Sequence, residues 1–281
     1  MRQIGLDSII NQYINNNLKR AFTAIPCRVT SVNNMGQQRI NVQPIINIVK
    51  TSDEELEHTI IQNVPVVFPG SSTSQFSFPV NVGDTVLCVF SQRSLDRFKL
   101  GAKNPHRPID LRKMSRNDAV AIPGLFPFED AVNNPGKRSL GHSTEDAVVT
   151  HNIGTGNECE VRLKPSGDVV INSPTTVQVN CQEAEVNAEN STTVNTSTAN
   201  INASSSVTID SPTTTVTGEM LVQGTFTFTS GMVGSGSAGG ATASITGSMD
   251  VTDDVVGGGV SLKSHTHGGV QTGPGNTGVP N

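Results

Sequence analysis

The chain has 281 residues, of which 35% are hydrophobic and 4% aromatic, with no tryptophan and a single tyrosine. Average soluble domains contain roughly 45–50% apolar residues, so this composition argues against a globular enzyme built on one large core. The net charge of −5 is unevenly placed, because residues 165–262 contain nine acidic residues and no lysine or arginine. A segment of that charge repels phosphate, which argues against nucleic-acid binding there.

The four cysteines, Cys27, Cys88, Cys159 and Cys181, are irregularly spaced and form no C-x-x-C motif. They therefore indicate neither a zinc ribbon nor a redox pair. No basic-then-apolar signal opens the sequence, and no apolar run reaches the length of a membrane span. We expect a protein that is made in the cytoplasm and lacks a transmembrane segment.

The first predicted element is a short amphipathic helix over residues 8–22, in which Ile10, Ile14 and Leu18 recur every four residues. Asp7 or Ser8 is predicted to cap its start. The helix either packs on the domain that follows or docks on a partner, and the sequence alone does not choose between these.

From Ala24 onwards the hydrophobic period changes to two, which predicts strands. A turn is expected at residues 33–36 and another at Gly83–Asp84. Four or five short antiparallel strands in about 75 residues fit an OB-type barrel. The residues expected to line its strands are Val29, Val32, Ile40, Val42, Ile46, Ile48, Val64, Val66, Phe68, Val86, Cys88 and Phe90. With the Pro- and Asn-rich linker that follows, this domain is predicted over 23–145, after a helical segment over 1–22.

An internal repeat follows the barrel. Its anchor residues are separated alternately by eight and seven positions, and the segments INSPTTV (171–177) and IDSPTTTV (209–216) nearly duplicate each other. The anchors are Ile171, Val179, Val186, Val194, Ile201, Ile209 and Val216. Each unit reads as a strand of about five residues followed by a turn, and such a unit buries almost nothing unless it stacks on neighbours.

The repeat offers only one narrow row of β-branched residues to a core. A solenoid made by a single chain needs bulkier inward residues, whereas three identical chains winding around one axis bury such rows against each other and satisfy every strand edge. We therefore predict an intertwined, trimeric, triple-stranded β-helix over 146–262, with the single-chain solenoid as the alternative. Glycines become frequent after Leu221, which suits a prism that narrows.

The sequence ends in SHTHGGVQTGPGNTGVPN, in which His265 and His267 are two positions apart. Residues i and i+2 of an extended chain face the same side, so both imidazoles can converge on one ion. Three chains on a threefold axis would supply six imidazoles, and octahedral nitrogen coordination suits divalent iron, nickel or cobalt better than zinc. A metal-binding tip is thus predicted over 263–281, with Gly268 and Gly269 allowing a sharp turn, Val270 and Val279 packing near the ion, and Pro274 and Pro280 stiffening the return.

The order of barrel, acidic repeat, SHTHGG and Gly/Pro-rich end resembles the central membrane-piercing spike of contractile-tailed bacteriophages. The stretches VFPGSSTSQFSFPVNVGDTVLCVFSQRSLDRF and DAVAIPGLFPF are similar to the N-terminal domain of that family, and SHTHGG is similar to its tip. The resemblance implies a mainly β protein with an OB-fold that attaches a homotrimer to baseplate hub or tail tube proteins. It also implies a tapering β-helix capped by an iron ion, about one per trimer, held by His265 and His267 of three chains.

The function implied is mechanical and not enzymatic. Contraction of the tail sheath would drive the spike, a virion protein assembled in the host cytoplasm, through the outer membrane of a Gram-negative host. The lysozyme domain that some relatives insert between barrel and spike has no room here. A trimeric tail fibre or adhesin stalk that binds a surface receptor remains an alternative, and a β-helical carbohydrate-active enzyme is a weaker one, because the repeat has no tyrosine or tryptophan.

Overall fold

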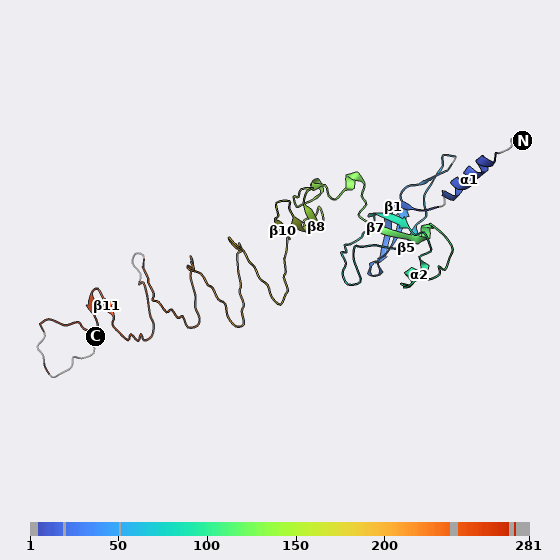
Figure 1. The fold of residues 1–281 in the computed structure, drawn as a ribbon. Helices are drawn as coiled ribbons and strands as arrows, with labels where there is room; N and C mark the ends of the chain where they lie inside the picture. The colour runs from blue at the N-terminus through green and yellow to red at the C-terminus, as the bar shows by residue number, and fades with distance from the viewer. Residues whose placement is uncertain (1–4, 19–20, 51, 237–240, 270–272, 274–281) are drawn as a thin grey trace. The chain divides into compact units, whose positions relative to one another are not determined.

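The structure is a computed structural model that describes residues 5–18, 21–50, 52–236, 241–269 and 273. The chain divides into two units, Met1–Asn187 and Ala188–Asn281, which are described separately. The architecture is mainly β, as predicted, with one helix of more than four residues in the described part (Figure 1). That part contains no helix long and apolar enough to cross a membrane.

Helix α1 runs from Leu6 to Leu18, so it begins before the predicted residue 8, and Phe22 lies outside it. The predicted cap is wrong: Asp7 and Ser8 lie inside the first turn, and the amide groups of Ser8 and Ile9 donate to the carbonyl of Gly5. Asp7 still favours the helix there, because a negative charge near the N-terminus complements the helix dipole. None of the helix residues is buried.

A curled five-stranded antiparallel sheet forms the N-terminal domain, in the order β5-β2-β1-β6-β7. Its first and last strands approach each other where Val66 and Ala121 form an isolated parallel bridge and the amide of Val67 donates to Ala121 at 2.9 Å. The strand count and this closing contact fit the predicted OB-type barrel. The strands are β1 (Ala24–Asn34), β2 (Arg39–Pro44), β5 (Ile61–Pro65), β6 (Thr85–Phe90) and β7 (Ala119–Pro123).

The core of this domain follows the alternation seen in the sequence. β2 and β6 bury every second residue, and the thiols of Cys27 and Cys88 are fully buried among valines. The turn at Gly83–Asp84 is confirmed, with Gly83 at a φ of 99°. The buried residues are Cys27, Val29, Ile40, Val42, Ile61, Val64, Val66, Phe68, Val80, Val86, Cys88, Phe90, Ala119 and Ala121.

Two predicted core residues, Ile46 and Ile48, are exposed. β2 ends at Pro44, and the chain then leaves the sheet for a small hairpin of β3 (Ile48–Val49) and β4 (Glu55–Leu56). The alternating pattern continues past the end of the sheet, so the period alone did not mark where burial stops.

A buried ion-pair network fixes the segment between β6 and β7, which also contains the short helix α2 (Asp96–Lys99). The Asp118 side chain is fully buried and accepts hydrogen bonds from the Leu95 amide at 2.8 Å and from Arg112 Nε at 2.7 Å. Arg112 also pairs with Asp96 at 2.8 Å and with Asp110 at 3.2 Å. Three carboxylates raise the pKa of Arg112, Asp118 foremost, so this guanidinium stays charged. Short 3-10 turns at Met35–Gln37, Arg116–Asp118, Phe128–Asp130 and Pro135–Lys137 complete the connections.

A second sheet follows in the same unit, a meander of β8 (Ala147–His151), β9 (Cys159–Leu163) and β10 (Val169–Asn172) in the order β10-β9-β8. One face carries charged side chains: Glu160 is fully buried and pairs with Arg162 at 3.0 Å, and Asn172 donates to Glu160 at 2.9 Å. Segment 138–146 covers that face, because Arg138 bonds to Thr150, and Gly141 and Asp146 both contact Arg162.

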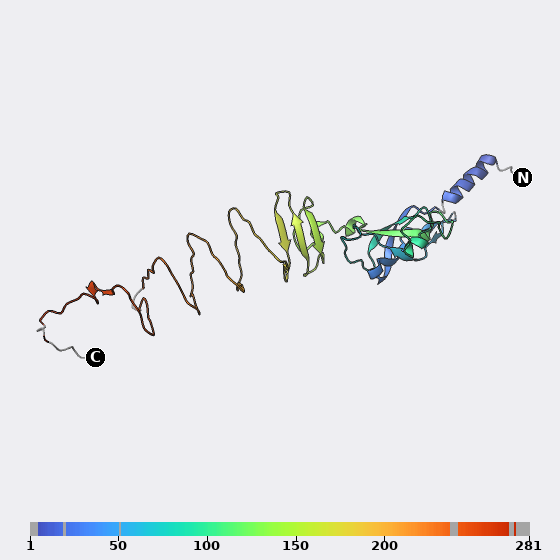
Figure 2. The same ribbon diagram turned by 60° about the horizontal axis from the view of Figure 1, so that its bottom comes forward.

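Beyond Asn172 the chain forms neither strand nor helix until β11 (Val256–Gly257) and β12 (Val260–Ser261), within the described residues. It runs as successive extended segments, each of several residues between two bends, which we call passes (Figure 2). Between 173 and 253, every described residue is exposed, and the described residues of this stretch donate no backbone–backbone hydrogen bond.

Candidate metal centre

The predicted metal ligands follow a short hairpin at the end of the described chain. β11 and β12 pair through Val256 with Ser261 and Gly257 with Val260. The two residues between them, Gly258 and Gly259, have φ values of 60° and 86°, the left-handed conformation that a tight hairpin turn requires. The sequence VGGGV thus encodes the turn that carries the chain into Ser264–His267.

The structure brings His265 and His267 together. Their ring centroids lie 5.0 Å apart and the rings meet edge to face at 75°. Both side chains are exposed. The prediction that the two imidazoles share one side of the chain is therefore confirmed within a single chain.

A backbone carbonyl holds one of the two rings. Ser261 O accepts a hydrogen bond from His265 Nδ1 at 2.7 Å and another from the His265 amide at 3.1 Å. Because a carbonyl oxygen only accepts, Nδ1 is the donor of this hydrogen bond, and in the neutral ring Nε2 is then the nitrogen with the lone pair. Metal-binding histidines are oriented in this way by a partner of the second ring nitrogen, so the donor chemistry at His265 fits a transition-metal ion.

Asp254 organises the turn that presents this carbonyl, and the sequence analysis missed it. Asp254 Oδ1 accepts the Lys263 amide at 3.1 Å, and Ser261 Oγ accepts the Ser264 amide at 2.9 Å. The hydrogen bond from Ser261 lowers the pKa of Asp254 despite partial desolvation, and the amides of Lys263, Val255 and Leu262 lower it further. No motif marks Asp254, because the hairpin alone brings it to Ser261 and Lys263.

Within one chain, the described residues hold no group of three or more His, Cys, Asp or Glu side chains able to bind a metal ion. The site predicted from sequence needs two imidazoles from each of three chains, so it stays a prediction. Val270, Pro274, Val279 and Pro280, which were expected to pack around the ion, lie outside the described residues.

The repeat anchors occupy a regular position in the extended passes. Bends occur near residues 174, 182, 190, 197, 205 and 212, and one anchor lies between each pair of neighbouring bends. Side chains form some of these bends: Ser173 Oγ donates to the Thr176 carbonyl at 3.2 Å, and Ser211 Oγ, at the equivalent place of the duplicated segment, donates to Thr213 at 2.8 Å. All seven anchors are 56–79% exposed in the single chain.

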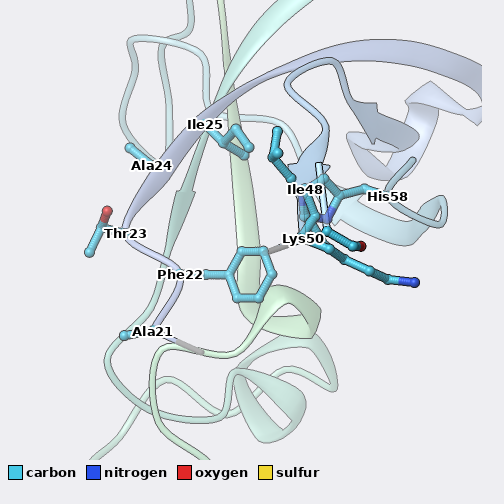
Figure 3. A pocket seen from close by; sticks show the side chains of 10 residues that line it. Ala21, Phe22, Thr23, Ala24, Ile25, Ile48, Lys50 and His58 are labelled. Atoms are coloured by element: carbon cyan, nitrogen blue, oxygen red, sulfur yellow. The ribbon is translucent and has the colours of Figure 1, made fainter. Parts of the chain in front are cut away.

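The N-terminal domain also has a pocket, of about 590 Å³, between the start of β1 and the β3–β4 hairpin (Figure 3). Phe22 is one of the residues that line it, and its ring packs on those of His58 and Phe90, with ring centroids 6.0 Å and 5.1 Å apart. Burial and then the charge of Arg116 lower the pKa of His58. Among the described residues that line the pocket there is no carboxylate or thiol.

Two protein families match the chain. Residues 25–124 match the Phage protein Gp138 N-terminal domain, which covers the curled five-stranded sheet, and residues 259–281 match the GpV Apex motif, which contains His265 and His267. The comparison with curated proteins gives no match. Both matching families are features of the central spike of phage baseplates, and they occur here in the order barrel, then apex. Together the two matches support a structural protein of a bacteriophage baseplate spike, located in the virion tail.

Proposed function

We propose that the chain forms a homotrimeric spike that pierces the outer membrane of a Gram-negative host when the tail sheath contracts. The observation that carries this proposal is the stretch 173–253, which repeats a single aliphatic anchor but buries no described residue in one chain. Fixing a backbone costs about 1–2 kcal/mol per residue, so a regular extended chain of this length needs partner strands.

The hydrogen-bonding pattern favours three chains over a single-chain solenoid. In a solenoid, successive coils of one chain pair with each other. Here β8, β9 and β10 pair within one chain as an antiparallel meander, whereas the extended segments beyond Asn172 form no ladder with one another among the described residues. Strands from two further copies would fill the ladder and cover the anchors, and a closed trimer leaves no exposed edge.

The proposed tip holds one iron ion on the threefold axis through His265 and His267 of each chain. Six imidazole nitrogens suit divalent iron, and the ion would supply the order that the glycine-rich end cannot gain from burying side chains. Each chain contributes a preset geometry, because the Ser261 carbonyl holds His265 through Nδ1 and the two ring centroids lie 5.0 Å apart.

The surface chemistry supports mechanical penetration over adhesion. Residues 165–262 carry nine acidic residues and no basic one, so the shaft is repelled by the phosphates of a bacterial surface. The proposed action involves no catalysis. The N-terminal domain is proposed to attach the spike to hub or tube proteins of the baseplate, because the spike families at both ends of the chain imply contacts with other baseplate components.

Light scattering and metal analysis on the purified full chain test the assembly. We expect a trimer containing about one iron ion per three chains, and the double variant His265→Ala/His267→Ala should stay trimeric but lose the metal. Thr266→Ala, between the two histidines, is the matched control and should keep it. A monomer, or one ion per chain, contradicts the proposal.

Force spectroscopy tests the piercing function. A spike tethered through its N-terminal domain to a cantilever should break through a supported bilayer of lipopolysaccharide and phospholipid at lower force than the double histidine variant. The untethered spike should not bind vesicles of the same composition. Equal breakthrough forces for both spikes contradict a role of the metal-capped tip in penetration, and strong vesicle binding favours an adhesive function.

A further inference from the structure

The three-stranded sheet β8–β9–β10 has an apolar face that nothing in the described chain covers. Eight residues share this face, since they alternate with the residues of the charged face: Ala147, Val149, His151, Cys159, Val161, Leu163, Val169 and Ile171. They lie directly opposite one another across the strands, with Val161 between Val149 and Ile171, and Leu163 between Ala147 and Val169.

The exposure of this apolar face is large for a sheet that is already covered on its other side. Its five largest aliphatic side chains, Val149, Val161, Leu163, Val169 and Ile171, are 42–63% exposed. The other side is closed by segment 138–146 and by the ion pairs of Arg162 with Glu160 and Asp146. A contiguous aliphatic patch of this kind marks an interaction surface.

We infer that this apolar face binds the same face of two other copies of the chain, which together form a closed aliphatic collar where the shaft begins. The inference rests on the proposed trimer and extends it to strands that pair within their own chain. Ile171 is both the last residue of the face and the first anchor of the repeat, so the collar and the buried row of the shaft form one continuous surface. His151, opposite Cys159 at one end of the face, is its one polar side chain. The face carries no acidic residue, lysine or arginine, so its aliphatic side chains can pack against those of two other copies around a threefold axis.

The collar divides the trimer interface into two kinds. Before Asn172 in the sequence, the strands β8, β9 and β10 of each chain hydrogen-bond to one another, so each chain contributes only side chains to the interface. After Asn172, each chain contributes both side chains and backbone hydrogen-bonding groups to the interface. The collar therefore holds the three chains in register through side-chain contacts alone, just before the extended segments that no longer pair within their own chain.

Thiol protection tests the collar with no change to the face itself. Cys159 lies on the face, Cys181 is exposed, and Cys27 and Cys88 are fully buried. In the full-length Cys181→Ser chain, Cys159 should react with a maleimide-polyethylene glycol at least about tenfold more slowly than an exposed thiol, and a short bismaleimide should link chains into covalent dimers.

A pair of introduced cysteines sharpens the measurement. In the Cys159→Ala/Cys181→Ser background, Val161→Cys places a thiol at the centre of the face, and Thr144→Cys places one at an exposed position off it. We expect the thiol at 161 to be protected from the bulky maleimide-polyethylene glycol but linked between chains by the short bismaleimide. The thiol at 144 should be labelled freely by the first reagent and not crosslinked by the second.

The outcomes separate the collar from the trimer. If light scattering shows a trimer but the thiols at 159 and 161 react as fast as the one at 144, the collar is refuted and the proposed trimer stands. A monomer refutes both. Crosslinking at 144 without crosslinking at 161 shows that the chains meet through the opposite face and also overturns the inference.

Discussion

Replacing Ile201 by alanine distinguishes a buried shaft from an exposed one. In the single chain this anchor is 77% exposed, and substitutions at exposed positions change stability by about 0.5 kcal/mol or less. In the proposed trimer Ile201 faces two equivalent anchors, and truncating a buried isoleucine to alanine costs about 2–5 kcal/mol. Because the change occurs once in each chain, the expected loss is about 6–15 kcal/mol per trimer.

The assay is guanidinium-induced dissociation of the full-length protein, followed by circular dichroism and light scattering at matched protein concentration. Matched concentration is needed because the stability of an oligomer depends on it, and unfolding rates should be recorded as well, since intertwined chains separate slowly. The control is Asn202→Ala, the outward neighbour, which should change each chain by no more than about 0.5 kcal/mol. If Ile201→Ala and Asn202→Ala shift the transition equally, the anchors do not form a core and the trimeric shaft is wrong.

Three further substitutions test the barrel, the second sheet and the tip. Asp118→Asn removes a charge buried against Arg112 and should destabilise the N-terminal domain by about 3–5 kcal/mol. Asp110→Asn, at a solvent-exposed carboxylate, should cost much less, because exposed ion pairs contribute little; equal losses in denaturant unfolding argue against the buried network. Burial acts to raise the pKa of Glu158, but hydrogen bonds from Gly154, Ser139 and Leu140 outweigh it and lower the pKa. Its stabilisation is therefore complete above the unfolded value of about 4.3 and is lost as the pH falls through the lower folded pKa, so Glu158→Gln should flatten the acid side of the pH–stability profile, and an unchanged profile contradicts this role. Asp254→Ala should weaken iron binding about 10- to 100-fold in chelator competition, while the exposed neighbour variant Asp253→Ala should leave it unchanged; equal affinities would show that Asp254 does not position the tip.

The alternating pattern predicted the barrel well because its strands bury one face against a core of their own chain. Val29, Val42 and Val86 are buried as expected, since local period and tertiary burial coincide there. The pattern failed at Ile46 and Ile48, because Pro44 ends the ladder while aliphatic residues continue. It also gave no sign of the Arg112–Asp118 pair, which depends on how the loop between β6 and β7 folds back.

At the tip, too, the sequence pattern predicted one feature and missed another. Alternation in an extended chain was enough to place His265 and His267 on one side. The contact between His265 Nδ1 and the Ser261 carbonyl depends on the glycine hairpin and on Asp254. A turn of about four residues leaves no repeating hydrophobic pattern in the sequence, so the pattern could not predict this contact. The sequence therefore predicted that the two histidines lie close together, but it did not reveal Ser261 and Asp254, which orient His265; metal binding by the histidines stays a prediction.

The exposure of a side chain in one chain has a different meaning in the N-terminal domain than in residues 173–253. In the N-terminal domain an exposed residue, such as Phe128, does not belong to the core, because the core is complete within one chain. Between residues 173 and 253 no described residue is buried in one chain, so exposure there does not separate surface from core, and only the eight-and-seven spacing does. The residues that such a spacing selects are small, β-branched and uncharged, while acidic residues such as Glu183 and Asp210 lie off the anchor row. In the proposed trimer, a shaft that places its few aliphatic residues on one row and its charges elsewhere would gain its stability by wrapping with copies of itself, and it would then present a polar surface to the membrane that it is proposed to penetrate.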